Sequence, residues 1–287
     1  MSIDREQLKD ILPAIAGKLK FRPAIVEKDY YLTVILNRIE DLLSDKIVFK
    51  GGTLLNKIHL NYHRLSEDLD FTYYGEVSTR SQRSKAIAPI REKMPEFLKA
   101  LGLTSDKPEG DGFNNSTQYL FKLKYPSVFM DKEESVKLEI SLRQPPLDKP
   151  VHNVIKHFYQ DPFTGEDLFP GGKILSLSLN EAIAEKLKAA ITRKDVAVRD
   201  YYDLWYIAES GFDFYHGGFI KLFKSKLSAE GHSVDYRKKF GLKSDQIALL
   251  RSQIDLHLAP VIRAGENFDL DKVFDRFDTI LSDAKFE

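Results

Sequence analysis

The chain has no cysteine among its 287 residues, so disulfides and thiolate metal sites are excluded. This absence fits the reducing cytoplasm, which is the default location for such a sequence. An excess of one charge is missing too, because 43 Lys and Arg residues balance 43 Asp and Glu residues. No overall field therefore attracts nucleic acid or a membrane, and an anionic partner has to be held by a local patch.

Long apolar runs are also missing, since none approaches the roughly 18 to 20 residues that cross a bilayer. The N-terminal stretch mixes acids with its apolar residues and has no small-residue cleavage site, so we do not interpret it as a secretion signal. We expect a soluble protein with no membrane partner. The 43% apolar and 11% aromatic content is sufficient for a sizeable core, and the length favours one large domain or two ordinary ones.

Apolar periodicity predicts helices over residues 4–20 and 24–43, followed by a buried strand over 47–49. A glycine pair, Gly51-Gly52, comes next, and we expect the following helix to begin at Thr53. Alternating and β-branched residues predict three more strands, and a basic segment predicts one more helix. These strands are 69–74, 118–126 and 135–142, and the helix is 79–101.

Proline, glycine and aspartate are concentrated towards the middle of the chain, where we expect a boundary between two lobes. The first lobe would cover residues 1–150 and the connecting segment residues 151–172. After this segment the apolar spacing is almost wholly helical, so a helical lobe is predicted over 173–287. The order of elements indicates the α+β class.

Two carboxylates, Asp68 and Asp70, lie one residue apart in a stretch with strand character. Successive strand residues point to opposite faces, so both aspartates project from one face while Leu69 and Phe71 project from the other. Neighbouring carboxylates repel each other, and a divalent cation is an economical way to keep both ionised. Mg²⁺ is the natural candidate, with Mn²⁺ as an alternative.

A third carboxylate, Glu139, has the correct period to face the same way in the strand over 135–142. Carboxylates on adjacent strands can hold two metal ions about 3.5 to 4 Å apart and clamp an in-line phosphoryl displacement. Without side chains, Gly51 and Gly52 would let the backbone approach phosphate oxygens. A glycine pair alone usually marks a turn, and an Asp-x-Asp alone is usually a solvated strand edge, so only their combination is informative.

The segments "KGGTLL" and "RLSEDLDF" resemble the nucleotidyltransferase family of AbiEii/AbiGii-type and MenT-type toxins. The resemblance implies a polymerase-beta-like nucleotidyltransferase core, with a mixed sheet and flanking helices, plus a helical C-terminal lobe. It also implies a nucleotide and metal site, in which Glu139 stands where family members commonly carry aspartate. The implied nucleotide-binding residues are Lys50, Gly51, Gly52, Thr53 and Ser66, and the implied metal ligands are Asp68, Asp70 and Glu139.

The resemblance extends from about residue 24 to about residue 210, and includes "AEKLKAAITR" and "RDYYDLWYI". These downstream motifs imply that Lys186 contacts nucleotide phosphates and that an aspartate completes the catalytic set. Asp203 is favoured slightly over Asp200 for that aspartate. Lys186 and Arg193 are seven residues apart on a predicted helix, so they share a face and both could reach an anionic ligand.

Other basic residues have more ordinary interpretations. Lys188 and Lys194 lack the motif position, and a solvated helix face is the simpler expectation for them. Residues 221–243 contain seven Lys and Arg residues against two acids, which makes this segment the best local candidate for an RNA-backbone patch. A loose basic surface explains the same segment equally well.

The preferred hypothesis is a toxin that transfers a nucleoside monophosphate from an NTP to an acceptor hydroxyl, with pyrophosphate leaving. The resemblance implies a tRNA 3′ end as a plausible RNA acceptor and an AbiEi-like antitoxin as partner. One alternative is a nucleotidyltransferase that acts on a protein or a small molecule. A second alternative is a catalytically silent nucleotide- or RNA-binding module, although keeping repelling carboxylates without a metal costs stability.

Overall fold

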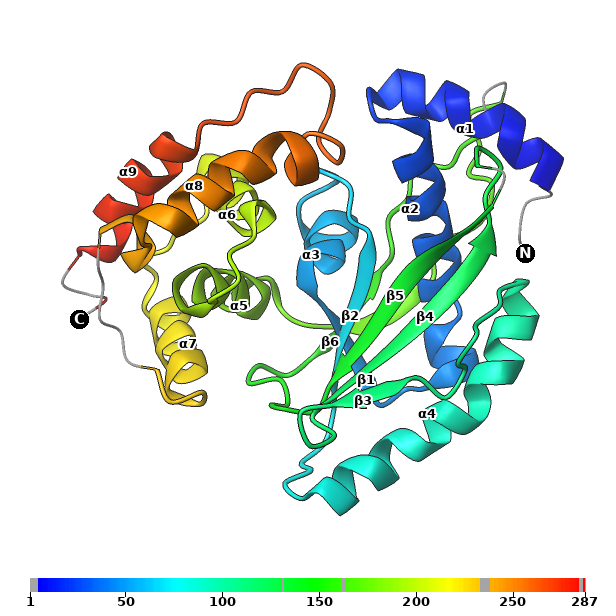
Figure 1. Cartoon of the computed structure of the whole chain (residues 1–287), viewed down its shortest axis with the longest axis horizontal. Coiled ribbons are helices and arrows are strands. Elements are labelled where there is room, and N and C mark those ends of the chain that lie inside the picture. Colours follow the sequence, from blue (N-terminus) through cyan, green and yellow to red (C-terminus); the bar gives the residue numbers. More distant parts are fainter. Residues whose placement is uncertain (1–4, 131, 162–163, 233–237, 284–285, 287) are drawn as a thin grey trace. The chain divides into compact units, whose positions relative to one another are not determined.

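The computed structural model describes residues 5–130, 132–161, 164–232, 238–283 and 286. The chain forms two compact units, Met1–Leu177 and Ser178–Glu287. The first unit contains the β-sheet, and the described residues of the second unit form helices and loops (Figure 1).

In the described part of the first unit, seven strands form one mixed sheet in the order β3-β4-β5-β2-β1-β7-β6. Strand β2 lies between β1, which is antiparallel to it, and β5, which is parallel to it. Strand β7 runs parallel to β1, and the remaining neighbours are antiparallel. The strands are β1 Ile47–Lys50, β2 Asp68–Tyr73, β3 Asp111–Phe113, β4 Gln118–Pro126, β5 Glu133–Ser141, β6 Val151–Val154 and β7 Lys173–Ser176.

One face of this sheet is buried because its strands alternate apolar and polar residues. In β5, Val136, Leu138 and Ile140 are fully buried, whereas Lys137 between them is exposed. Helix α2 packs against β5 (Figure 1). The polar residues of β2 and β5 lie on the opposite face, where the candidate site is found.

The helices of the first unit begin and end near the predicted positions. The predicted helix 24–43 is divided, because α2 ends at Leu36 and a π-helical turn, η1, follows it. Helix α4 begins with a capping box between Thr79 and Gln82 and ends at Gly102, which has a positive φ of 66°. The bounds are α1 Arg5–Leu19, α2 Pro23–Leu36, η1 Ile39–Leu43, α3 Gly51–Leu54, the π-helical η2 Leu55–His59 and α4 Arg80–Leu101.

The segment predicted as a connection, 151–172, begins with β6 in the structure. Strand β6 pairs with β7, and β7 pairs with β1, so both strands extend the sheet of the first unit. The two compact units divide between Leu177 and Ser178. Strand β6 is short, and it is stabilised by pairing with a strand that is distant in the sequence. Local composition, which is rich in proline and glycine here, therefore does not predict it.

The second unit is built around aromatic side chains that pack edge to face, including Phe214, Phe219 and Phe277. Its first helix begins at a cap in which the Ser178 side chain accepts a hydrogen bond from the Glu181 backbone N–H at 3.1 Å. The bounds are α5 Leu179–Thr192, α6 Val198–Glu209, α7 Gly217–Ser228, the 3₁₀ turn η3 Lys238–Gly241, α8 Ser244–Gln253, the π-helical η4 Ile254–Leu258 and α9 Leu270–Leu281.

The predicted α+β class, with a mixed sheet, flanking helices and a helical second lobe, is confirmed. No helix in the described parts of the chain combines the length and the apolar character needed to cross a membrane.

Candidate active site

The glycine pair lies at the end of β1, directly beside a carboxylate of β2. Gly51 has a φ of +79°, and an ideal Cβ placed on it would lie 2.2 Å from Oδ2 of Asp70. A Cβ on Gly52 would lie 2.6 Å from Nη2 of Arg64. Gly51 therefore requires glycine for its backbone conformation and for its close approach to Asp70, whereas at Gly52 the tip of the Arg64 side chain would have to move. Helix α3 begins at Gly51, so the prediction that it begins at Thr53 is wrong by two residues.

Asp68 and Asp70 are half-buried, whereas Leu69 and Phe71 are fully buried on the other face of β2. Parallel pairing with β5 places Asp70 opposite Glu139. Antiparallel pairing with β1 places Lys50 opposite Asp70 on the other side. One cation and two carboxylates, Lys50, Asp70 and Glu139, therefore form a row across three adjacent strands on one face of the sheet.

The metal-binding capacity of this face rests mainly on two side chains. Among the described residues, no group of three or more His, Asp or Glu side chains is placed to hold a metal ion. Asp68, Asp70 and Glu139 thus do not converge on one point in this structure. Mg²⁺ is commonly bound by one or two carboxylates, with substrate phosphates and water as the other ligands. Asp68 and Asp70, half-buried on one face of β2, provide the carboxylate oxygens that such an ion would take as ligands.

The other predicted nucleotide-binding residues of the first unit are close to this turn but well covered. Thr53 is 1% exposed, and its hydroxyl donates a hydrogen bond to the backbone carbonyl of Asp68 at 2.5 Å. This side chain ties α3 to β2, so what Thr53 offers a ligand is restricted to its backbone. Ser66 is also buried, and its Oγ lies 3.5 Å from the position of a Cβ on Gly52.

In the second unit, Lys186 lies between both candidate aspartates. Its Nζ is 2.8 Å from Oδ1 of Asp200 and 3.0 Å from Oδ2 of Asp203. Asp200 also accepts a hydrogen bond from Nη1 of Arg193 at 2.9 Å. The side chain of Asp203 is fully buried, whereas that of Arg193 is 57% exposed. The two cations and two carboxylates neutralise one another within this cluster.

Two expectations for basic residues of the second unit are wrong. Lys188 was expected on a solvated face, but its side chain is only 12% exposed and pairs with Glu230 at 2.6 Å. Lys226, part of the predicted basic patch, is buried and pairs with Glu181 at 2.5 Å and Glu185 at 3.0 Å. In both cases the lysine pairs with an acid that is distant in the sequence, so the spacing of residues along one helix cannot predict the pair. Residues 233–237 of the same patch lie outside the described residues.

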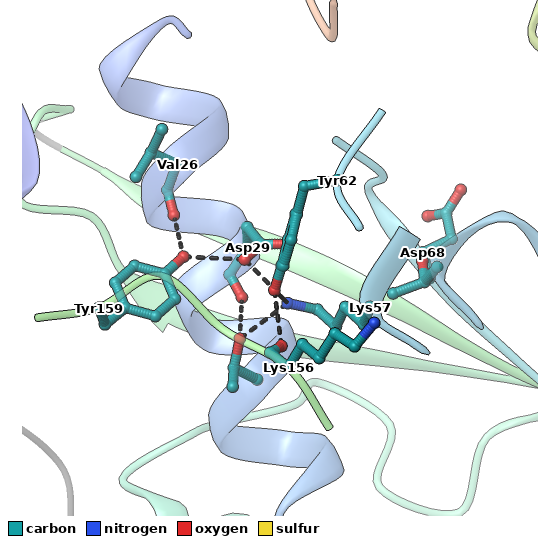
Figure 2. A network of polar contacts seen from close by, with 9 residues as sticks. Val26, Asp29, Lys57, Tyr62, Asp68, Lys156 and Tyr159 are labelled. Atoms are coloured by element: carbon teal, nitrogen blue, oxygen red, sulfur yellow. Dashed lines mark hydrogen bonds and ion pairs between the residues drawn. The ribbon is translucent and has the colours of Figure 1, made fainter. Parts of the chain in front are cut away.

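Sequence reasoning missed a buried polar network centred on Lys57 of η2, in the segment that follows the glycine pair (Figure 2). Lys57 Nζ donates to Oδ2 of Asp29 at 2.8 Å, to Oγ1 of Thr33 at 2.8 Å and to the hydroxyl of Tyr62 at 3.0 Å. The Tyr159 hydroxyl donates to the same Asp29 oxygen at 2.9 Å. Burial lowers the pKa of Lys57, and the Asp29 carboxylate opposes this shift. The sequence does contain a signal for this network. Asp29 and Lys57 each occupy a position in a helical segment where the apolar spacing predicts a buried residue.

Comparison with known proteins reveals a family and several related folds. A family model described as "Nucleotidyl transferase AbiEii toxin, Type IV TA system" matches residues 34–283. A search of curated protein sequences finds no significant match.

Among solved structures, the chain is similar to MenT4, a nucleotidyltransferase toxin of Mycobacterium tuberculosis H37Rv, with 19% identity and a TM-score of 0.59. That alignment covers 98% of this chain and 90% of MenT4. A putative nucleotidyltransferase from H. pylori has 16% identity and a TM-score of 0.50, over 91% of this chain and 94% of its own. JHP933 from Helicobacter pylori has 15% identity and a TM-score of 0.50, over 91% of each chain. These similarities confirm the nucleotidyltransferase fold.

The family match covers most of the chain, including β1, the glycine pair and β2 from the first unit and Lys186 with its two aspartates from the second. The predicted resemblance is therefore confirmed, and membership implies an NTP substrate and an antitoxin. The chain belongs to the AbiEii nucleotidyltransferase toxin family of type IV toxin–antitoxin systems.

Proposed function

We propose that this nucleotidyltransferase moves a nucleoside monophosphate from an NTP to the 3′-terminal hydroxyl of a tRNA in a metal-dependent reaction. The observation that carries the proposal is the close approach of Gly51, at the end of β1, to Asp70. An ideal Cβ on Gly51 would lie only 2.2 Å from Oδ2 of Asp70. A backbone without side chains beside a carboxylate offers amide groups to phosphate and oxygen ligands to a cation.

Asp68 and Asp70 would hold Mg²⁺, or Mn²⁺ in its place, together with oxygens of the triphosphate. When bound, the ion would polarise the α-phosphate and neutralise charge that develops during transfer. Glu139, opposite Asp70 in the sheet, would accept the proton of the acceptor hydroxyl. The hydroxyl oxygen then bonds to the α-phosphorus while the bond to pyrophosphate breaks, so atoms and charge balance.

The nucleotide phosphates are proposed to contact four consecutive residues, namely Lys50, Gly51, Gly52 and the backbone of Thr53. Ser66 lies close behind them. In the second unit, Lys186 and Arg193 are proposed to offset the charge of the triphosphate. Asp200 and Asp203 hold the Lys186 ammonium in one orientation, and Arg193, at 57% exposure, is the more accessible of the two cations. Both aspartates contact Lys186, so both are proposed to position it.

The test is transfer of label from each of the four α-labelled NTPs to total tRNA, with Mg²⁺ or with chelator. The Asp70→Asn variant removes one proposed ligand, and Asp45→Asn is its matched control because that side chain is 75% exposed at the other end of β1. Labelled tRNA that requires Mg²⁺ and Asp70, but not Asp45, would support the proposal. Full transfer by Asp70→Asn would remove Asp70 from the site.

The acceptor is tested separately. Lys221 and Lys224 remain accessible in the basic segment, whereas Lys226 does not. If RNA is the acceptor, Lys221→Ser/Lys224→Ser should raise KM for tRNA and weaken its dependence on salt. An unchanged KM, or label on protein or a small molecule instead of tRNA, would favour another acceptor. Mg²⁺-dependent NTP binding without any transfer would favour a silent binding module.

The antitoxin partner is proposed to be AbiEi-like, in accordance with the sequence resemblance. Co-expression with such an antitoxin should restore growth to cells in which the parent chain is toxic. The Asp70→Asn variant should not be toxic, because the proposed toxicity requires transfer.

A further inference from the structure

We propose that the buried ion pair of Asp29 and Lys57 positions the glycine turn for catalysis. Resting on the function proposed above, this assigns Asp29 and Lys57 as positioning residues that act through Gly51 and Gly52 without touching substrate.

The network joins three segments that are distant in the sequence (Figure 2). Helix α2 contributes Asp29 and Thr33, and η2 contributes Lys57. Tyr62 donates to the Lys156 backbone carbonyl at 2.7 Å, which brings in the chain before Tyr159. Hydrogen bonds therefore join the segment after the glycine pair to α2 and to the loop that follows β6.

Lys57 is held in a single orientation. An ammonium has three N–H donors, and all three have acceptors here: a carboxylate, a threonine hydroxyl and a tyrosine hydroxyl. The side chain is completely buried, with no exposed area, and that of Asp29 is 2% exposed. Because each acceptor has its own position, movement of η2 along α2 would break several bonds at once.

The same segment is attached at a second point near the carboxylates. Thr53, four residues before Lys57, donates to the backbone carbonyl of Asp68. Between these two attachments the chain changes from the α-helical α3 to the π-helical η2. π-Helical turns are rare and occur frequently at functional sites. The two attachments together determine where Gly51 lies against Asp70.

A buried ion pair usually contributes little net stability to a fold. Well-packed apolar residues of similar volume often stabilise a fold as well or better, because they avoid the cost of desolvating two charges. An ion pair with three directional bonds does specify position, and a displacement of about 1 Å near reacting groups can cost about 100-fold in rate. Gly51 has little room for such a displacement.

The test compares two isosteric amide variants on the same helix. Asp29→Asn weakens the network at Lys57. Glu27→Gln is the matched control, because Glu27 is equally buried on α2 but accepts hydrogen bonds from Ser127 Oγ at 2.7 Å and from the Val128 backbone at 2.6 Å. Both variants should unfold at lower temperature. At a temperature where both are folded, Asp29→Asn should raise KM for the NTP and lower kcat, with at least about a tenfold loss in kcat/KM.

Glu27→Gln should keep both kinetic constants within about twofold, because its contacts do not reach the glycine turn. A purely structural role for Asp29 would lower only the unfolding temperature. If Asp29→Asn does not fold, Tyr62→Phe removes one acceptor of Lys57 and should produce a smaller effect in the same direction. Unchanged kinetic constants in the variant that folds would overturn the proposal.

A second readout separates this proposal from the proposed function. Hydrogen exchange of the amides in residues 51–59 requires no substrate, and it should be about tenfold faster in Asp29→Asn than in the parent or in Glu27→Gln. A parent chain without transfer activity would overturn the proposed function, whereas the exchange rates would still decide whether the pair holds the turn. Equal exchange in all variants would overturn the positioning role.

Discussion

Gly51 and Asp70 approach so closely that a Cβ on Gly51 would lie 2.2 Å from the carboxylate oxygen Oδ2. Gly51→Ala should therefore displace Asp70 or the turn and lower transfer by about 100-fold. It should also lower the free energy of unfolding by about 1–3 kcal/mol, because alanine is strained at a φ of +79°.

The control for this substitution is Gly17→Ala. Gly17 lies in α1, and no atom lies within 4 Å of the position of its Cβ. This variant should keep full activity and gain about 0.5–1 kcal/mol of stability, because alanine favours the helix. Transfer assays and urea unfolding measure both effects. Full activity of Gly51→Ala would show that the close approach is unimportant.

Removing Lys186 should destabilise the second unit far more than removing Arg193. Lys186→Met leaves Asp200 and Asp203, which are 6% and 0% exposed, without their shared ammonium. Loss of one partner from a buried ion pair costs about 3–5 kcal/mol. Arg193→Met removes a cation that is 57% exposed, and such surface pairs contribute about 1 kcal/mol or less.

Urea unfolding of the parent chain and of both variants measures these losses. Equal losses for Lys186→Met and Arg193→Met would contradict the prediction.

Two histidines of the first unit should make the fold sensitive to mild acid. Burial lowers the pKa of both His59 and His157 below the ordinary value of 6.5. The unfolded chain then binds protons first, so the stabilisation is complete above pH 6.5 and is lost as pH falls through the folded pKa values.

The measurement is urea unfolding of the parent chain and of His59→Gln/His157→Gln between pH 7.5 and 5. The double variant should lose less stability on acidification than the parent. Glu27 acts in the opposite direction, because burial raises its pKa and its contribution is lost as pH rises above 4.5. Glu27 is the same in both proteins, so their difference isolates the histidines. Identical pH profiles would contradict the prediction.

Asn56 should be a source of instability next to the glycine turn. Its side chain is 1% exposed, and neither Nδ2 nor Oδ1 has a hydrogen-bond partner among the described residues. A buried polar group without a partner costs about 1–3 kcal/mol. Asn56→Leu keeps the branching of the side-chain heavy atoms without the polar groups and should raise the free energy of unfolding by about 1 kcal/mol. A loss of stability on urea unfolding would indicate that the amide binds water or another group.

Local patterns in the sequence predict much of the fold because they depend on neighbours in the chain. Alternation in β5, with Val136 and Leu138 inward, is a property of any half-buried strand. Helix α3 begins two residues before the predicted Thr53, and Gly51, with a left-handed φ of +79°, forms the turn that leads from β1 into it. Strand β6 was missed, since its pairing partner, β7, lies about 20 residues later in the chain.

The sequence by itself determined the family and the shared face of Asp68 and Asp70, because the motif and the strand period are local properties. Only the tertiary structure decided that Glu139 lies opposite Asp70, since strand register is a long-range choice. It also decided that Lys57 pairs with Asp29 in the core while Lys194 stays exposed. A charge has no intrinsic preference for one acid over another, and packing alone brings particular partners together.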